Sequence, residues 1–141
     1  MPAPYTGQCL CGGVSFVISS EPTTIMSCHC NHCQKGAGGV SQTIAKFSSA
    51  DVKITAPDDI ISQYTLTDTG SGNPKQKHFC RVCGCTLWTI PAAAEGTAYI
   101  IRTSLIDGGL NLVPNHEIYV KNRPKWMMPS DGVPQWEESR K

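Results

Sequence analysis

Three groups of cysteines restrict the fold of this chain more than any other feature of its sequence. The eight cysteines are spaced Cys9-x-Cys11, Cys28-x-Cys30-x-x-Cys33 and Cys80-x-x-Cys83-x-Cys85. Cysteines this close together are poorly placed to form a disulfide with each other, whereas both the CxC and the CxxC spacing can bind one metal ion. The spacing therefore favours metal binding, and a disulfide framework remains the alternative for a chain that is exported.

The first and last groups predict a structural zinc site. Zinc bound for structure takes four soft ligands in a closed tetrahedron, and two pairs that are distant in sequence can supply them while joining remote segments. We expect the ligands to be Cys9, Cys11, Cys80 and Cys83. Gly84 follows the last of these, as suits the tight turn of a zinc knuckle.

The central group predicts a second, catalytic zinc. Its members are Cys28, Cys30 and Cys33. Three thiolates leave a tetrahedral ion with one exchangeable position, the usual arrangement for catalysis. His29, His32 or Cys85 could instead close the site, or the three cysteines could join others in a closed site or a two-zinc cluster. Because the groups form two separate sets, an iron–sulfur cluster is disfavoured.

The remaining roles of these neighbours stay open in the sequence. His29 and His32 either donate hydrogen bonds behind the metal ligands or face solvent, and either one is a candidate proton donor. Cys85 is interpreted as a spare core thiol, with a place near the second zinc as the alternative.

Charge and hydropathy disfavour two classes of partner. The net charge is +1 with 16% charged residues, which provides no basic stripe for a nucleic acid. The longest apolar runs, such as "AYII", are too short to cross a bilayer, and "MPAPYTGQ" has neither the charged nor the apolar region of a signal peptide. We expect a cytoplasmic protein that acts on a small molecule, without nucleic-acid or membrane partners.

The apolar pattern predicts a mainly β fold of compact, packed antiparallel sheets with many turns, stapled by zinc. Short runs rich in β-branched or aromatic residues are bounded by Gly, Pro, Asp or Asn, and no long segment has a helical period. The predicted strands are Val14–Ile18, Val40–Phe47, Ile60–Leu66, Lys77–Cys80, Thr86–Ile90, Ala98–Thr103 and His116–Val120. Residues 1–141 are expected to form a single zinc-binding domain.

Three polar or glycine-rich segments are assigned to connections. "DTGSGNPKQK" (68–77) is interpreted as a hairpin connection, and "GAGG" (36–39) as a tight turn or a close approach of the backbone to a ligand. The proline-rich segment 123–141 is expected to lie across the body in extended form, with the residues after about 137 frayed.

The ordered motifs "GQCLCGGVSF", "CHCNHCQK", "KHFCRVCGC" and "HEIYVKNRPKW" closely resemble the family of glutathione-dependent formaldehyde-activating enzymes, which includes centromere protein V. The resemblance runs from about Gly7 to Trp136. It implies packed antiparallel sheets with two zinc ions per chain. By that resemblance the first and last cysteine pairs bind the structural zinc, and the central three bind the catalytic one.

The resemblance also implies an activity. The family's founding reaction joins glutathione to formaldehyde, so we expect a zinc-dependent carbon–sulfur lyase that adds or removes a glutathione-type thiol at a small carbonyl compound. The basic residues are scattered in the sequence, with no cluster for the two carboxylates of glutathione, so the substrate itself stays open. The alternatives are a zinc-dependent hydrolase, decarboxylase or isomerase, and a non-catalytic zinc-binding module.

Overall fold

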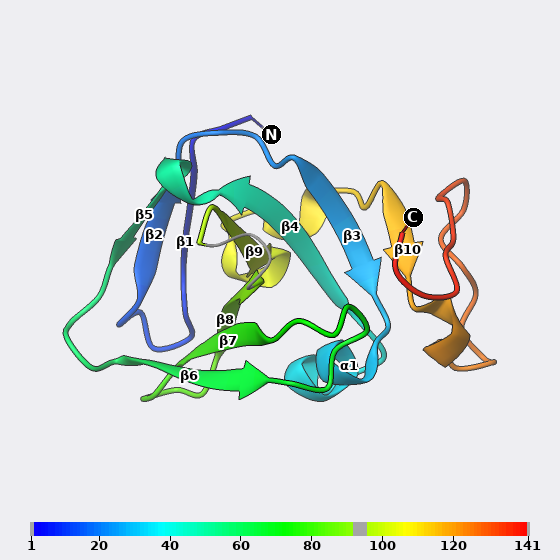
Figure 1. Ribbon diagram of the computed structural model, residues 1–141. Coiled ribbons are helices and arrows are strands. Elements are labelled where there is room, and N and C mark those ends of the chain that lie inside the picture. Colours follow the sequence, from blue (N-terminus) through cyan, green and yellow to red (C-terminus); the bar gives the residue numbers. More distant parts are fainter. Residues whose placement is uncertain (1, 92–95, 141) are drawn as a thin grey trace.

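Two β-sheets form the body of the protein, seen in a computed structural model that describes residues 2–91 and 96–140 (Figure 1). The smaller sheet has the strand order β1-β2-β5 and the larger has the order β10-β3-β4-β9-β8-β7-β6. The small sheet contains β1 (Tyr5–Gln8), β2 (Ser15–Ile18) and β5 (Val52–Thr55). The large sheet contains β3 (Thr24–Cys28), β4 (Gln42–Ser48), β6 (Ile61–Leu66), β7 (Lys75–Cys80), β8 (Thr86–Pro91), β9 (Ala98–Arg102) and β10 (His116–Ile118).

Helical structure is limited to short pieces in the described residues. The α-helix α1 spans Asn31–Ala37, and the 3₁₀ turns are η1 (Ser49–Asp51), η3 (Thr103–Leu105), η4 (Gly109–Asn111) and η5 (Val120–Asn122). None of these helices is long and apolar enough to cross a membrane.

The mainly β prediction is confirmed, and each of the seven predicted segments contains a strand. The sequence did not predict β1, β3, β5 or α1. These strands have four or five residues, and α1 has seven, which is too short for a helical period to stand out. The sheets are antiparallel as expected except for β10, which pairs in parallel with β3.

The main hydrophobic core lies where the two sheets pack together. Phe16 from the small sheet meets Trp88 from the large one edge to face, with ring centroids 6.2 Å apart. Tyr5 packs against Phe47 in the same way. Neighbouring residues of a strand point to opposite faces of a sheet. The other face of the large sheet therefore carries a second set of side chains that take no part in this core.

That other face carries a smaller apolar cluster around Cys28, Cys33 and Ile44. Helix α1 packs beside it. The helix begins after Cys30, whose sulfur accepts a hydrogen bond from the Cys33 N–H, and ends at Gly38 with φ of 69°. The left-handed conformation of Gly38 confirms the tight turn predicted for "GAGG".

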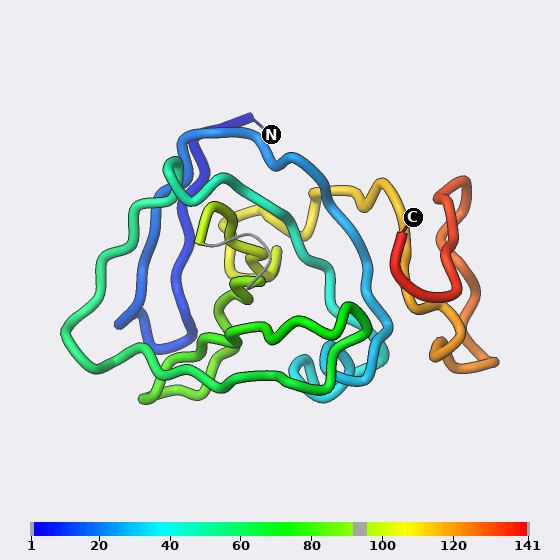
Figure 2. The backbone as a smooth tube through the Cα atoms, viewed as in Figure 1, coloured from blue at the N-terminus to red at the C-terminus, as the bar shows by residue number. Residues whose placement is uncertain are grey.

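The chain after β10 returns along it in extended form, as expected. The Glu117 N–H donates to Pro134 O, the Trp136 N–H donates to Glu117 O, and Tyr119 N–H donates to Glu138 O. Figure 2 shows this segment folding back beside residues 116–122. The chain is thus bonded to β10 and its following turn as far as Glu138, and Lys141 lies outside the described residues.

Candidate functional site

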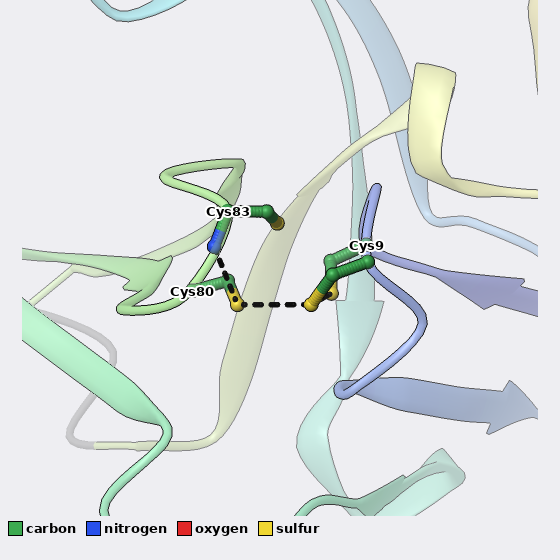
Figure 3. A group of neighbouring side chains, drawn as sticks. Cys9, Cys80 and Cys83 are labelled. Atoms are coloured by element: carbon green, nitrogen blue, oxygen red, sulfur yellow. Dashed lines mark hydrogen bonds between the residues drawn. The ribbon is translucent and has the colours of Figure 1, made fainter.

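The first and last cysteine groups meet where the loop after β1 faces the turn between β7 and β8. The four sulfur atoms, from Cys9, Cys11, Cys80 and Cys83, all lie within 4.8 Å of one another. The Sγ atoms of Cys9 and Cys11 are 3.6 Å apart, and those of Cys11 and Cys80 are 3.7 Å apart. Figure 3 shows Cys9, Cys80 and Cys83 converging from the two loops.

The spacing of these sulfurs suits a zinc ion. A tetrahedron of sulfurs with Zn–S distances of about 2.3 Å has edges of about 3.8 Å, close to the two measured separations. Backbone N–H groups also point at the sulfurs, from Val14 to Cys9 and from Cys83 to Cys80. Although desolvation opposes ionisation, hydrogen bonds from the backbone of Cys85 and Cys11 lower the pKa of Cys83 to about 6.

Cys85 stands outside both sulfur groups. It packs, half-buried, against the main core, and its backbone carbonyl accepts a hydrogen bond from the Cys80 N–H. Desolvation raises the pKa of its thiol, and the charges that act on it come from Cys83, Cys9 and Cys80. The structure thus places Cys85 near the four-sulfur group and supports its interpretation as a spare thiol.

The central group forms a separate three-sulfur cluster on the opposite face of the large sheet. Cys28 ends β3, Cys30 caps α1 and Cys33 lies in its first turn, so the strand-to-helix turn itself gathers the sulfurs. Their atoms lie within 4.8 Å of one another, and among the described residues no further His, Cys, Asp or Glu completes this group.

The pKa of each of the three thiols depends on the other two. Hydrogen bonds from Cys28 and Cys33 lower the pKa of Cys30 to about 2, and the same contact with Cys30 raises the pKa of Cys28. Ionising all three at neutral pH therefore requires a cation among them. The donor set fits one soft divalent ion with a coordination position left for another molecule.

The three-sulfur cluster opens into a cavity of about 410 Å³, a size that suits a small metabolite. Strands of the large sheet form its floor, α1 and the segment after β10 form two walls, and the β6–β7 loop forms the rim. The lining residues that matter here are Cys28, Cys30, Cys33, Lys75, Lys77, Arg102, Tyr119 and Lys121.

Basic side chains converge on this cavity, although they are scattered along the sequence. Lys75 and Lys77 project from β7, Arg102 from the end of β9 and Lys121 from η5, against the single carboxylate of Asp68. The expectation that the chain has no basic cluster was therefore wrong. Alternation places Lys75 and Lys77 on one face of β7, but only the strand order shows that Arg102 shares that face.

Arg102 is the most deeply placed of these cations, with 8% of its surface exposed. Its Nη1 donates to Thr89 Oγ1 at 2.8 Å and to Ile100 O at 3.2 Å, and its Nε is buried without a partner among the described residues. Desolvation lowers the pKa of Arg102, and negative charge on Cys33, Cys28 and Cys30 acts in the opposite direction. The guanidinium therefore lies close to the three sulfurs.

Tyr119 also lines the cavity and was missed by the sequence reasoning. Its backbone adopts φ of 55°, which is rare for a residue other than glycine and often marks a functional position. Desolvation first, and then the charges of Cys30 and Cys28, raise the pKa of its hydroxyl. The side chain is therefore protonated at neutral pH and lies near the sulfurs.

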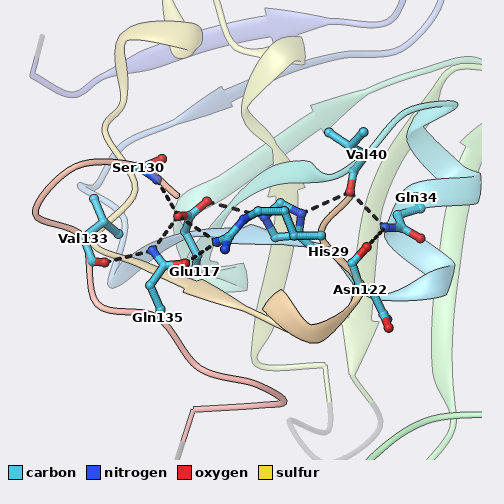
Figure 4. Close-up of polar contacts among 9 residues, drawn as sticks. His29, Gln34, Val40, Glu117, Asn122, Ser130, Val133 and Gln135 are labelled. Carbon is cyan, nitrogen blue, oxygen red and sulfur yellow. Dashed lines mark hydrogen bonds and ion pairs between the residues drawn. The ribbon is translucent and has the colours of Figure 1, made fainter. Parts of the chain in front are cut away.

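His29 lies behind the three-sulfur cluster and does not face solvent. It is fully buried, with Nδ1 3.2 Å from Val40 O and Nε2 3.4 Å from Glu117 Oε1 (Figure 4). Glu117 in turn accepts hydrogen bonds from Ser130 N–H, Arg123 Nη2 and Gln135 Nε2. His29 is thus committed to protein partners, whereas His32 lines the cavity.

Comparisons with known proteins place the chain in a family. A search of curated proteins finds no significant match. Among solved structures, the fold resembles the crystal structure of a Rhodobacter sphaeroides protein, with a TM-score of 0.56 and 17% identity, over 93% of this chain and 98% of that one. The sequence matches the family described as "Glutathione-dependent formaldehyde-activating enzyme" over residues 4–122, most of its length. The chain therefore belongs to the family of glutathione-dependent formaldehyde-activating enzymes.

Proposed function

We propose that this protein is a zinc-dependent carbon–sulfur lyase that adds a glutathione-type thiol to a small carbonyl compound, or removes it, in the cavity on the large sheet. The observation that carries the proposal is the separation of the two sulfur groups. The three-sulfur cluster lines the cavity, whereas the four-sulfur group joins the two sheets and lines no part of it. We therefore assign chemistry to the three-sulfur cluster and a structural role to the four-sulfur group.

We assign the seven clustered cysteines to two zinc sites. Cys28, Cys30 and Cys33 would hold the catalytic zinc, and Cys9, Cys11, Cys80 and Cys83 the structural one. Zinc bound by Cys28, Cys30 and Cys33 would supply a Lewis acid that lowers the pKa of an incoming thiol and keeps its sulfur nucleophilic. Two zinc ions per chain are expected.

The lysines of the cavity suit the charge of the thiol substrate. A glutathione-type thiol carries carboxylates, and we assign their binding to Lys75 and Lys77 with the thiol sulfur at the inner end of the cavity. Lys121 also lines the cavity, but its Nζ already pairs with Glu138 Oε2 at 2.9 Å. Binding at both ends would fix the sulfur beside the carbonyl compound, which replaces a random encounter by a positioned one.

The chemical step needs a proton for the oxygen of the carbonyl. The thiol sulfur forms a bond to the carbonyl carbon, the second bond of the carbonyl opens onto oxygen, and that oxygen takes a proton. Tyr119 is the group we assign to this transfer, because it lines the cavity near the sulfurs and its raised pKa keeps it protonated. The proton lost by the thiol restores the phenol.

A reducing compartment suits this chemistry. Both sulfur groups need free thiols to bind metal, and the three-sulfur cluster faces an open cavity where oxidants can reach it. We therefore place the protein in the cytoplasm.

Exchange spectroscopy tests the proposal directly. The purified, reduced protein is mixed with glutathione and formaldehyde, and formation of the hydroxymethyl adduct is followed by NMR exchange. We expect exchange above the uncatalysed rate, lost in Cys30→Ser while Cys85→Ser retains it. An uncatalysed rate with the unmodified protein would remove this substrate pair, and full activity in Cys30→Ser would remove the three-sulfur site.

A further inference from the structure

The arginine on the floor of the cavity differs from the three lysines in what it can bind. Lys121 is exposed and Lys75 and Lys77 are half-buried, so water can solvate them when the cavity is empty of ligand. Arg102 is buried, and its hydrogen-bond partners, Thr89 and the Ile100 carbonyl, are neutral. No carboxylate of the described residues pairs with it.

The negative charge nearest to Arg102 is that of the three sulfurs, and a divalent ion bound among them would offset most of it. A buried guanidinium is then unfavourable unless a ligand supplies an anion. The orientation of Arg102 says where that ligand binds. Thr89 and Ile100 hold Nη1, and Nε is buried without a partner among the described residues. A ligand that bonded the edge carrying Nε would therefore satisfy a donor that the protein leaves unpaired. An arginine edge with two parallel N–H groups matches the two oxygens of a carboxylate.

The position of Arg102 also says which reactant the carboxylate belongs to. Arg102 pairs in register with Ile44, which packs in the same apolar cluster as Cys28 and Cys33. The carbonyl carbon must come within about 3–3.5 Å of the reacting sulfur. Arg102 lines the same cavity as the three sulfurs, so it is the buried cation available to a carboxylate on the neighbouring carbon, whereas formaldehyde is neutral and offers Arg102 no charge.

We propose that the carbonyl substrate of this protein is a 2-oxo acid, whose carboxylate binds Arg102 while the thiol adds to the adjacent carbonyl carbon. The inference rests on the proposed function. With glyoxylate as the simplest member, the carbon–sulfur bond forms, the carbonyl opens to a hydroxyl, and the thiol proton is balanced by the proton on that hydroxyl. The product is a hemithioacetal that carries a carboxylate, and no oxidant or reductant takes part.

Two measurements test this inference, one of rate and one of binding. Rates of adduct formation are compared for glyoxylate and formaldehyde, each with glutathione. Binding of glycolate, an unreactive carboxylate of the same length, is measured by calorimetry without thiol, with ethylene glycol as the neutral control. We expect glyoxylate to be preferred at least tenfold, and glycolate but not ethylene glycol to bind.

The variants assign the carboxylate to Arg102. Arg102→Gln should weaken glycolate binding by about 10- to 100-fold, as expected for a lost charged hydrogen-bond pair, and raise KM for glyoxylate more than for formaldehyde. Arg102→Lys keeps the charge without the fork and should recover only part of the binding. Thr89→Val, which leaves the arginine in place, should weaken glycolate binding several-fold and covers the case in which the arginine variants fail to fold.

The outcomes separate this inference from the function on which it rests. Catalysis with formaldehyde but no preference for glyoxylate, and no glycolate binding, would overturn the 2-oxo acid alone. Glycolate binding that survives in Arg102→Gln would place the carboxylate on the lysines and overturn the assignment to Arg102. Catalysis with neither carbonyl compound would remove the proposed function, while glycolate binding that depends on Arg102 would still support the carboxylate site.

Discussion

Tyr119 shows how a single residue can hold a functional position that sequence patterns do not reveal. It follows directly on β10 and precedes a 3₁₀ turn, its φ is positive, and it lines the cavity. In the sequence it is one aromatic residue in a predicted strand. Nothing in its spacing from the cysteines indicates that it lies near them.

Removing the hydroxyl of Tyr119 tests its role as proton donor. A positioned general acid contributes about 10² to 10⁴ in rate, so Tyr119→Phe should lower kcat by about 10²-fold with little change in KM. Tyr64→Phe is the matched control, because Tyr64 is exposed on β6 and does not line the cavity. An unchanged kcat in Tyr119→Phe, with zinc content and melting temperature as in the parent, would show that another group delivers the proton.

The cysteines are the part of the site that the sequence could group by itself. The cysteines of each group are only a few residues apart, so they lie close together in space however the rest of the chain folds. Lys77, Thr89 and Arg102 could not be grouped in this way. Alternation predicts which residues of one strand share a face, but the partner strands and their register depend on contacts between distant segments.

At the scale of elements, the stability of α1 depends on Gly38, which caps its C-terminal end. The helix carries Cys33 and has only two turns, so most of its stability comes from its caps and its packing. Gly38 adopts φ of 69°, and an added Cβ would meet no atom within 4 Å, so backbone conformation alone decides the effect of a substitution.

Alanine substitutions at the end of α1 separate the effect of backbone conformation from the effect of steric clashes with an added Cβ. Gly38→Ala should lower the free energy of unfolding by about 1 kcal/mol, because a left-handed conformation is unfavourable for alanine. Gly39→Ala is the control, since Gly39 has equally open surroundings but no positive φ, and should change stability by less than about 0.5 kcal/mol. Denaturant titration measures both, and equal effects would contradict the role of the left-handed cap.

The buried carboxylate of Glu117 links β10, the extended tail and the turn that carries the cysteines. Burial would raise its pKa, but hydrogen bonds from Gln135, Ser130 and His29 outweigh that effect and hold the pKa below its usual range. A pKa that is lower in the folded state stabilises the fold above the unfolded pKa of about 4.3. This contribution is lost as the pH falls through the lower, folded value.

Glu117→Gln should therefore destabilise the protein by about 3 kcal/mol at pH 7, because it leaves Arg123, whose side chain is only 11% exposed, without its anion. The difference from the parent should shrink as the pH falls below about 4. Glu138→Gln serves as the comparison, since Glu138 pairs with Lys121 at the exposed surface and its loss should amount to less than about 1 kcal/mol. Thermal unfolding from pH 3 to 7 measures this, and a pH-independent difference would argue against an ionised Glu117.

For the molecule as a whole, the two sulfur groups have unequal weight in holding the structure together. The four-sulfur group joins a loop of the small sheet to a turn of the large one, and Cys9 and Cys80 are part of the main core. The three-sulfur cluster lies within one strand–helix turn, so losing it leaves the packing of the two sheets untouched.

Cysteine-to-serine variants should show that difference in zinc content and fold. Cys80→Ser should abolish stable folding, because it removes a ligand at the joint between the sheets. Cys30→Ser should lose one zinc per chain and stay folded, and Cys85→Ser should keep both ions. Metal analysis and circular dichroism measure these outcomes; a folded Cys80→Ser protein with two zinc ions would contradict the structural role.

The parallel pairing of β10 with β3 sets the order in which the cavity can be completed during synthesis. Ile118 lies opposite Cys28, and its carbonyl accepts a hydrogen bond from the His29 N–H, yet the ribosome makes it roughly 90 residues after Cys28. At about 5–20 residues per second the three thiols wait for several seconds, unshielded, before their supporting wall emerges. Oxidation of Cys28, Cys30 and Cys33 should therefore be faster in a nascent chain that ends before Ile118 than in the finished protein, where this wall stands beside the sulfurs.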